Sequence, residues 1–404
     1  MPQQRGSVTS ALKLALGTGL GGAGLLGAGS VGLATYFARR VVTPDAEKQD
    51  DVAVRAVERD GDGGTVTMDA TVDTRAPGRY GLWLQGGAGH ARLGDVLGVG
   101  EATDTVTREL RGVDAGVLAP GSARWNQYYY AGSPEWSLGL PTRDVVVTSD
   151  VGGLDAWLVP GRGTDVPEQP GDGQDSGRWA VLVHGRGARR DEALRAVPVL
   201  HELGTTCLVP SYRNDVGAPA SADGMHNLGL SEWRDVEAAM LYAVRHGAQD
   251  LVLVGWSAGG AIVLQALDRS WLSDRVSRIV LDAPVIDWAD VLRHQARLNH
   301  VPLPVESLSR VLIGRSATRR LVGVHEPIDV AKTNWVARAE ELRTPTLLIH
   351  SEADEFVPSG PSEELARARP DLVRLETGWG ARHTKEWNVD PERWDAAVRD
   401  FLRS

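Results

Sequence analysis

The chain is predicted to be an α/β protein with a mostly parallel central sheet and helices on both faces. From about residue 144 to the C-terminus, short apolar runs alternate with longer helix-like segments. Continuous apolar runs are typical of strands buried on both faces, and their alternation with helices is typical of parallel neighbours. An opening hairpin is expected at 145–147 and 156–159, further strands at 179–183, 206–209, 251–254, 278–281, 346–350 and 372–375, and helices at 191–203, 231–246, 258–269, 361–369 and 391–402.

Residues 285–343 interrupt this alternation of strands and helices. Several leucines stand there among many arginines, which indicates a helical insertion over the strand ends. A helical cap at that place would shape a substrate pocket. The alternative is that these residues form ordinary outer helices of the sheet.

The segment from about residue 50 to 142 has a different pattern. Its apolar runs are short and alternate with polar residues, and turns rich in glycine and aspartate separate them. Such alternation predicts strands with one buried face, so we expect a small antiparallel β module. Its expected strands are 52–57, 65–68, 80–84 and 105–110.

Residues 1–40 are expected to form a single-pass membrane anchor, a transmembrane helix outside the globular part. No charged residue occurs between Lys13 and Arg39, and the apolar run 14–38 is long enough to cross a bilayer as a helix. A basic pair ends the run, and nearby positive charges favour the C-terminal side as cytoplasmic. The alternative is a signal peptide cleaved near 28–30, which would leave a secreted protein.

Composition narrows the classes of function. Of the 404 residues 42% are hydrophobic, which is enough for a large core. The net charge of −10 argues against nucleic acid as a partner. The single cysteine, Cys207, cannot form an internal disulfide. The histidines have no partners at metal-ligand spacing, so we expect neither a metal nor a cofactor.

One serine lies where a buried strand turns sharply into a helix. The strand 251–254 leads into Gly255-Trp256-Ser257-Ala258-Gly259, and helix 258–269 follows directly. Only small neighbours tolerate the strained backbone of such a turn, which exposes the serine oxygen. The first N–H groups of the helix and its positive dipole end then face any charge that forms beside that oxygen. This arrangement favours acyl transfer at Ser257.

A serine nucleophile needs a base that a carboxylate orients. Strand 346–350 leads into a polar loop that carries Asp354, the expected acid, with Glu352 and Asp287 as rivals. The alternative for Asp354 is a structural role as a helix cap. After the last strand, a glycine-rich loop carries His383, the expected base. The order serine, acid, histidine along the chain is typical of one class of triad enzymes.

The remaining requirement is a pair of N–H donors for the oxyanion. Strand 179–183 ends in the segment 184–187, where two glycines let the backbone turn toward the serine. We therefore assign the oxyanion hole to the main-chain N–H groups of Arg186 and Ala258. The alternative is a simple turn that ends the strand.

From about residue 144 to 404 the chain resembles the α/β-hydrolase superfamily, and within it the serine esterases and peptidase-like members. Their motifs are HG, G-x-S-x-G, D-x-x-V-P and a late G-x-x-H, and they match residues 184–185, 255–259, 354–358 and 380–383. The resemblance implies an α/β-hydrolase fold. One departure is Arg382, which stands where glycine is usual before the histidine. This cation either restricts the loop or favours an acidic group on the substrate.

Together these residues predict a serine hydrolase that cleaves a carboxylic ester, and secondarily an amide, through an acyl-enzyme on Ser257. The expected substrate is a small-molecule ester or a lipid-like molecule. One alternative is an acyltransferase, which would use the same triad. Another is a membrane-tethered scaffold with a hydrolase fold and no activity, although a decayed site is expected to have lost a triad residue.

Overall fold

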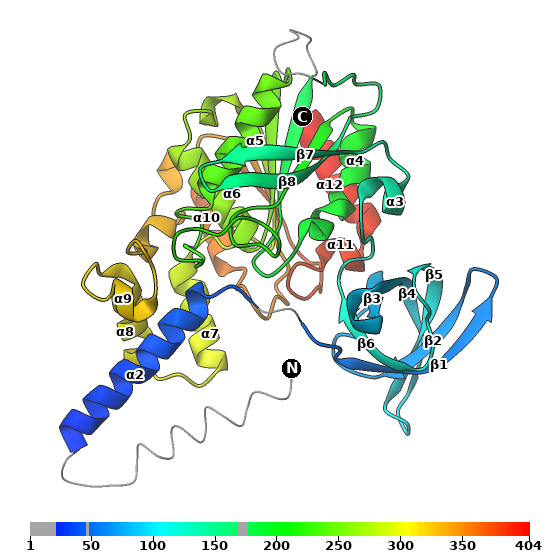
Figure 1. Cartoon of the computed structure of the whole chain (residues 1–404), viewed down its shortest axis with the longest axis horizontal. Coiled ribbons are helices and arrows are strands. Elements are labelled where there is room, and N and C mark those ends of the chain that lie inside the picture. The colour runs from blue at the N-terminus through cyan, green and yellow to red at the C-terminus, as the bar shows by residue number, and fades with distance from the viewer. Residues whose placement is uncertain (1–21, 46–47, 169–176) are drawn as a thin grey trace.

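The computed structural model describes residues 22–45, 48–168 and 177–404. Along the chain it contains a helix, a six-stranded barrel and an α/β unit (Figure 1). In Figure 1 the barrel lies on one side of the α/β unit and the N-terminal helix lies on the other.

The α/β unit is built on an eight-stranded sheet. Its strands are β7 (Arg143–Ser149), β8 (Gly152–Val159), β9 (Arg178–Val183), β10 (Thr206–Pro210), β11 (Asp250–Trp256), β12 (Val276–Asp282), β13 (Thr346–Ile349) and β14 (Val373–Glu376). They lie in the order β14-β13-β12-β11-β9-β10-β8-β7. β7 and β8 form an antiparallel hairpin, β8 is antiparallel to β10, and all other neighbours are parallel. The α/β-hydrolase fold predicted from the sequence is confirmed.

Helices cover both faces of this sheet (Figure 1). On one face lie α5 (Trp233–Arg245), α6 (Ala258–Arg269) and α10 (Gly360–Ala368), and on the other lie α4 (Val197–Glu202), α11 (Glu386–Val389) and α12 (Pro391–Arg403). Each face has its own hydrophobic core. The predicted helix 191–203 begins instead as a 3-10 helix, Arg190–Ala196, and becomes α4 only at Val197. Pro198 lacks an N–H and would clash with the carbonyl four residues earlier, so one continuous α-helix is excluded.

Where the sequence predicts a small antiparallel β module, the structure has a closed barrel. Its strands are β1 (Val52–Asp60), β2 (Gly63–Asp69), β3 (Tyr80–Leu84), β4 (Gly89–Gly100), β5 (Thr105–Ala115) and β6 (Gly121–Asn126). They pair in the order β1-β2-β5-β4-β3-β6, and β6 pairs with β1 to close the ring. The short helix α3 (Pro134–Leu138) then connects the barrel to β7.

Three helices occupy the region where the sequence predicts a cap, namely α7 (Trp288–Leu298), α8 (Leu303–Gly314) and α9 (Arg319–Val322). Their buried side chains form a separate hydrophobic core with Ala258, just after β11, and Val357, in the loop after β13. Both of these residues follow the carboxyl ends of parallel strands. The insertion therefore covers the edge of the sheet at which such folds bind ligands.

The N-terminal helix α2 (Gly22–Val42) packs against this cap, chiefly against α8. Ala34 and Ala38 are fully buried there. The prediction of a membrane-spanning helix over 14–38 is corrected for this part, because both side chains contact protein instead of lipid. Among the residues that the structure describes, no helix is both long and apolar enough to span a membrane. Residues 14–21 of the predicted span lie outside the described residues.

Candidate active site

Ser257 lies at the sharp turn between β11 and α6. Its backbone has φ +50° and ψ −119°, a conformation that costs energy for a residue with a side chain. The glycines two residues before and after it have no room for side chains: a Cβ on Gly255 would lie 2.8 Å from the Gly259 oxygen, and one on Gly259 would lie 2.2 Å from the Val183 oxygen. The predicted strand, turn and helix are all present, and the turn holds Ser257 in this strained position.

The side chains of Ser257, His383 and Asp354 form one line of hydrogen bonds. Nε2 of His383 is 2.8 Å from Oγ of Ser257, and its Nδ1 is 2.7 Å from Oδ2 of Asp354. An ionised carboxylate only accepts hydrogen bonds, so in the neutral ring Nδ1 carries the proton and Nε2 accepts from the serine hydroxyl. The fold thus brings together three side chains that lie far apart in the sequence.

Asp354 is fixed from two sides in the loop after β13. Its Oδ1 accepts hydrogen bonds of 2.8 Å from the main-chain N–H groups of Phe356 and Val357. Burial opposes its ionisation, but the charges and hydrogen bonds of His383 and His350 outweigh burial and hold the pKa of Asp354 well below its usual range. The carboxylate therefore stays ionised at neutral pH.

His350 is a residue of this site that the sequence does not reveal, because it reads only as the end of a strand. Its Nε2 lies 3.3 Å from Oδ2 of Asp354 and 3.1 Å from the Val357 oxygen, and its Nδ1 lies 2.7 Å from Oγ of Ser362. A carbonyl only accepts, so in the neutral ring Nε2 carries the proton. The buried imidazole then donates to the carboxylate that orients His383. Its only signal in the sequence is its position four residues before Asp354.

The two rival acids have other partners. Asp287 caps α7 by accepting from Ala289 N at 2.8 Å, and it also accepts from the Asn334 amide at 3.1 Å. Glu352 accepts from the main-chain N–H of Gly378. Among the described contacts, neither carboxylate bonds to His383. Asp354 is therefore the acid that the geometry favours.

The loop after β9 passes directly beside the serine. A Cβ on Gly185 would lie 3.2 Å from Cβ of Ser257, so the main chain that leads into Arg186 runs close to the serine. On the other flank, Ala258 is the first residue of α6, and its N–H has no carbonyl partner within the helix. The main chain at both predicted oxyanion positions thus flanks Ser257.

The side chain of Arg186 makes a contact that the sequence does not predict. Its guanidinium donates to the main-chain oxygens of Arg40 (3.1 Å), Thr43 (2.7 Å) and Val41, at the C-terminal end of α2. Nε of the same guanidinium lies 3.4 Å from the Asp45 carboxylate. The last carbonyls of a helix have no partner within it, and here Arg186 supplies one. The N-terminal helix is thereby tied to the proposed oxyanion loop.

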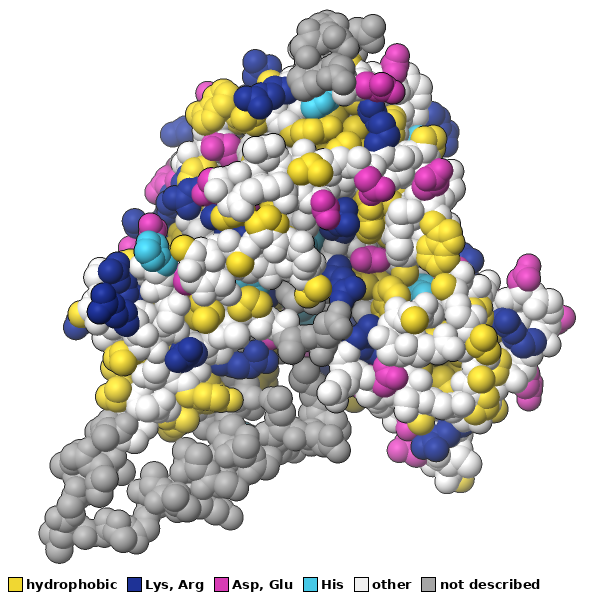
Figure 2. All heavy atoms as spheres, viewed as in Figure 1, with side chains coloured by type: hydrophobic (Ala, Val, Ile, Leu, Met, Phe, Trp, Pro, Cys, Tyr) yellow, Lys and Arg dark blue, Asp and Glu magenta, His cyan; other side chains and the backbone are white. Residues whose placement is uncertain are grey.

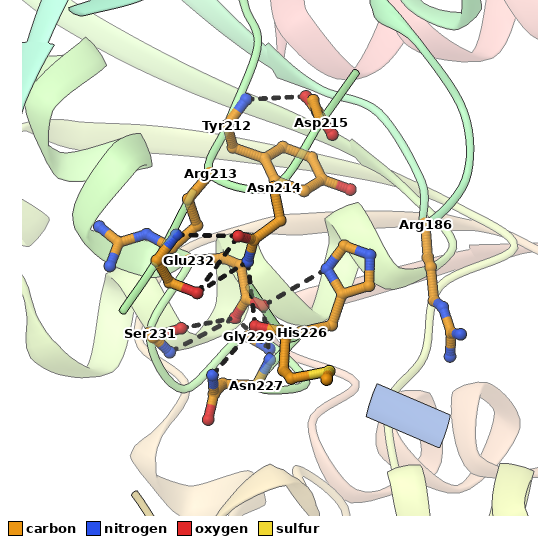
Figure 3. A network of polar contacts seen from close by, with 12 residues as sticks. Arg186, Tyr212, Arg213, Asn214, Asp215, His226, Asn227, Gly229, Ser231 and Glu232 are labelled. Carbon is orange, nitrogen blue, oxygen red and sulfur yellow. Dashed lines mark hydrogen bonds and ion pairs between the residues drawn. The ribbon is translucent and has the colours of Figure 1, made fainter. Parts of the chain in front are cut away.

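A small pocket of about 10 Å³, room for about one water molecule, lies beside Ala258, and its polar side is drawn in Figure 3. His226 points toward the buried Glu232, 3.8 Å away, while Arg186 stands on the opposite side of His226 (Figure 3). Glu232 is fixed by hydrogen bonds from the main-chain N–H groups of Asn227 (2.6 Å) and Gly229 (3.0 Å). The lining residues are Arg186, Tyr212, His226, Leu228, Gly229, Glu232, Ala258, Ile262 and Trp288.

Arg382, the departure from the family motif, is engaged within the protein. Its guanidinium is 2.6 Å from the carboxylate of Glu355 and 3.5 Å from that of Asp73, which belongs to the barrel. These partners favour the interpretation that Arg382 restricts the histidine loop over the one in which it binds an acidic substrate group. Within the described part of the chain, no cluster of three His, Cys, Asp or Glu side chains could hold a metal ion.

Two family models match the chain. The one described as "Alpha/beta hydrolase family" matches residues 180–399, and the one described as "Domain of unknown function (DUF8805)" matches residues 53–126. A search of curated proteins gave no match.

Several solved structures are similar to the α/β unit. The esterase Pf2001 from Pyrococcus furiosus is 17% identical with a TM-score of 0.50, over 68% of this chain and 93% of that chain. A serine hydrolase without lid from Xanthomonas campestris is 17% identical (TM-score 0.42, 65% and 94% covered), and a thermophilic esterase from Thermogutta terrifontis is 18% identical (TM-score 0.43, 65% and 98% covered). At this identity the likeness to the Pyrococcus esterase concerns the fold alone.

Proposed function

The chain belongs to the alpha/beta hydrolase family, and on this premise we propose that it is a serine hydrolase that cleaves a carboxylic ester through an acyl-enzyme at Ser257. The observation that carries the proposal is the line of hydrogen bonds, 2.8 and 2.7 Å long, from Ser257 through His383 to Asp354. This arrangement of nucleophile, base and orienting acid is the one that acyl transfer requires.

In the first half of the reaction, Oγ of Ser257 bonds to the ester carbonyl carbon while Nε2 of His383 takes the hydroxyl proton. The carbonyl oxygen becomes an oxyanion, which accepts from the N–H groups of Arg186 and Ala258. Asp354 stays ionised and stabilises the imidazolium. The intermediate then collapses, the bond to the alcohol oxygen breaks, and His383 gives its proton to the departing alcohol.

In the second half, a water molecule attacks the carbonyl carbon of the acyl-enzyme. His383 takes a proton from this water as the new carbon–oxygen bond forms, and it returns that proton to Oγ of Ser257 when the carboxylic acid leaves. An alcohol in place of water would give a new ester, so measuring products with competing alcohols separates hydrolysis from acyl transfer.

The acyl group is proposed to be short. The pocket beside Ala258 is small, and the packed side chains of Trp288, Ile262, His226 and Glu232 are among those that line it. A long chain would have to displace these packed side chains, at a cost in binding free energy. Among p-nitrophenyl esters, kcat/KM should therefore be higher for the acetate and butyrate than for the octanoate.

The nucleophile is tested with substitutions at Ser257 and His383. Either Ser257→Ala or His383→Ala should lower kcat by at least about a thousandfold, and the double variant should be little worse, because the residues act as a unit. A fluorophosphonate should label the wild type and not Ser257→Ala. The control is Ser270→Ala, at the other end of α6, where a buried serine caps the helix. Normal turnover in Ser257→Ala would refute the proposal.

The assignment of the acid is tested by comparing two variants in which an aspartate is replaced by asparagine. Asp354→Asn should leave a folded protein with a wrongly oriented imidazole and a kcat lower by a few orders of magnitude. Asp287→Asn should change kcat far less, because Asp287 caps α7. The opposite ranking would assign the acid to the loop after β12.

A further inference from the structure

The loop that carries His383 has little regular structure of its own. It runs from the end of β14 to the short helix α11, and Gly378, Gly380 and Thr384 all have positive φ. A threonine in that conformation is held there by its surroundings. The position of the imidazole therefore depends on what contacts this loop on each side.

The α/β unit holds the inner side of the loop. Oε1 of Glu355 accepts from Arg382 at 2.6 Å, and its Oε2 accepts from the main-chain N–H of His383 at 3.3 Å. Arg195, which is buried, donates to the Thr384 oxygen at 2.7 Å. These contacts fix one side of the loop and leave the side chains of Arg382 and Lys385 facing the barrel.

The barrel holds the outer side through Asp73. The Asp73 carboxylate lies 3.1 Å from Nζ of Lys385 and 3.5 Å from Nη1 of Arg382. These two cations flank His383 in the sequence, one residue before it and two after. Burial opposes ionisation of Asp73, but the two cations outweigh burial and hold its pKa below the usual range. One carboxylate of the barrel thus contacts a residue just before the histidine and a residue just after it.

Asp73 is presented by a loop that the barrel itself makes rigid. Arg108 is fully buried inside the barrel, and its guanidinium donates to the main-chain oxygens of Thr74 (2.9 Å), Ala76 (2.6 Å) and Gly78 (2.6 Å). A buried guanidinium with all these acceptors fixes the segment between β2 and β3. The Asp73 carboxylate is therefore held by a segment whose main chain is fixed.

A second strip of contacts joins the barrel to the end of the same loop. The side-chain amide of Asn388 donates to the main-chain oxygens of Arg79 (2.6 Å) and Gln127 (2.8 Å). The main-chain N–H of Arg79 donates in turn to the main-chain oxygen of Asn388 at 2.8 Å. A Cβ on Gly78 would lie 2.0 Å from that oxygen, so the two main chains are in direct contact. The barrel therefore contacts this segment at Arg382, Lys385 and Asn388.

We propose that the barrel positions the catalytic histidine loop, and that Asp73 is its principal positioning residue, through contacts with Arg382 and Lys385. This inference rests on the proposed function and gives the barrel a role in it. A single half-exposed ion pair contributes little to global stability, whereas a shift of about 1 Å in a catalytic group can cost roughly a hundredfold in rate. The effect of Asp73 should therefore appear in turnover more than in the melting temperature.

The test compares Asp73→Asn with Asp69→Asn in the full chain. Asp69 is a matched control because its side chain is equally exposed, at 37%, and pairs with Arg55 within the barrel, away from the loop. Asp73→Asn should lower kcat for p-nitrophenyl acetate about tenfold with little change in KM, and slow fluorophosphonate labelling to the same extent. Asp69→Asn should change neither. The two variants should have similar Tm.

A second pair of variants tests the contact without altering charge. Gly78→Ala should push the barrel away from Asn388 and lower kcat, whereas Gly61→Ala should not. Gly61 also has positive φ, but it lies at the β1–β2 turn with open space around its Cα, so it controls for backbone strain.

Hydrogen exchange of residues 378–388 separates this inference from the proposed chemistry. We expect these residues to exchange faster in Asp73→Asn than in Asp69→Asn. This result would support the positioning of the histidine loop by the barrel even if the wild type showed no esterase activity. Equal exchange and equal kcat in the two variants would overturn the positioning role of Asp73 but would not contradict the proposed triad.

Discussion

The guanidinium of Arg186 donates a hydrogen bond of 2.7 Å to the main-chain oxygen of Thr43, 143 residues earlier in the chain. The oxygens of Arg40 and Val41 accept from the same group. The main-chain N–H of Arg186 is a proposed oxyanion donor. Because the side chain of Arg186 is bound to the end of helix α2, the position of this N–H depends on where α2 ends. The N-terminal helix is thus part of the structure that supports the site.

Replacing Ala38 by Glu should lower kcat about tenfold. Ala38 is fully buried where α2 meets the cap, and an unpaired carboxylate there would drive the helix away together with the carbonyls that hold Arg186. Tyr36→Glu is the matched control, since Tyr36 is 57% exposed on the same helix. The measurement is kcat for p-nitrophenyl acetate on samples shown to be folded by circular dichroism. Equal kcat in the two variants would exclude α2 from the site.

Deletion of residues up to Arg40 is a second test of this contact. The candidate triad and the proposed oxyanion residues all remain in the truncated protein. The deletion removes Ala34 and Ala38 from the cap core. We therefore expect the truncated protein to lose activity at least to the extent of Ala38→Glu.

His350 should be needed to orient Asp354. His350→Leu removes the donor to the Asp354 carboxylate and to the Val357 oxygen, so kcat should fall about tenfold or more. His350→Gln keeps an N–H donor of similar reach and should retain more activity. Ser362→Ala, which alters only the partner of the other ring nitrogen, is the control. A kcat as high in the leucine variant as in the glutamine variant would contradict this role.

Asp395 should make stability depend on pH around neutrality. Burial raises its pKa to about 7 in the folded protein, from an ordinary value of 3.8. Its favourable contribution is therefore complete below about pH 4 and is lost as the pH rises through 7. The Asp395→Asn variant can still accept the hydrogen bond from Trp387. At pH 8 its free energy of unfolding, measured with urea, should exceed that of the wild type by up to about 4 kcal/mol. At pH 4 the two proteins should differ little.

The control for this prediction is Asp400→Asn, an exposed carboxylate on the same helix α12. It should show no such difference between pH 4 and pH 8. A constant offset between Asp395→Asn and the wild type at all pH values would mean that Asp395 is ionised throughout this range in the folded state.

The strands of the α/β unit could be predicted, and the residues of the candidate triad could be proposed, because their signals in the sequence are local. Buried strands such as β9 and β11 are continuous apolar runs, and the turn at Ser257 needs small residues at fixed positions. The sequence does not predict strand β4, for the opposite reason. Its sequence contains glycines at 89, 94, 98 and 100, so it reads as a series of turns, and only its neighbours β3 and β5 make it a strand.

The contacts of Arg186 with the end of α2 and of Asp73 with Arg382 and Lys385 could not be predicted, because each joins segments that lie far apart in the sequence. The apolar run that contains Ala34 and Ala38 predicts burial, but its sequence does not say whether lipid or protein buries it. Arg382 shows the same limit, since its departure from the family motif is visible and its partner Asp73 is more than 300 residues away. Long-range pairs of this kind require the fold.

The contact between the barrel and the histidine loop has a consequence for the order of folding. Asp73 is separated from Lys385 by 312 residues, and Arg79 from Asn388 by 309. During synthesis on a ribosome the barrel emerges about 300 residues before the segment 382–388 that it contacts. Contacts of such high sequence separation form slowly, because a long chain must be closed before they contribute. The barrel can therefore fold before the segment 382–388 has been synthesised, and we expect His383, the proposed catalytic base, to reach its final position only when the barrel docks on this segment.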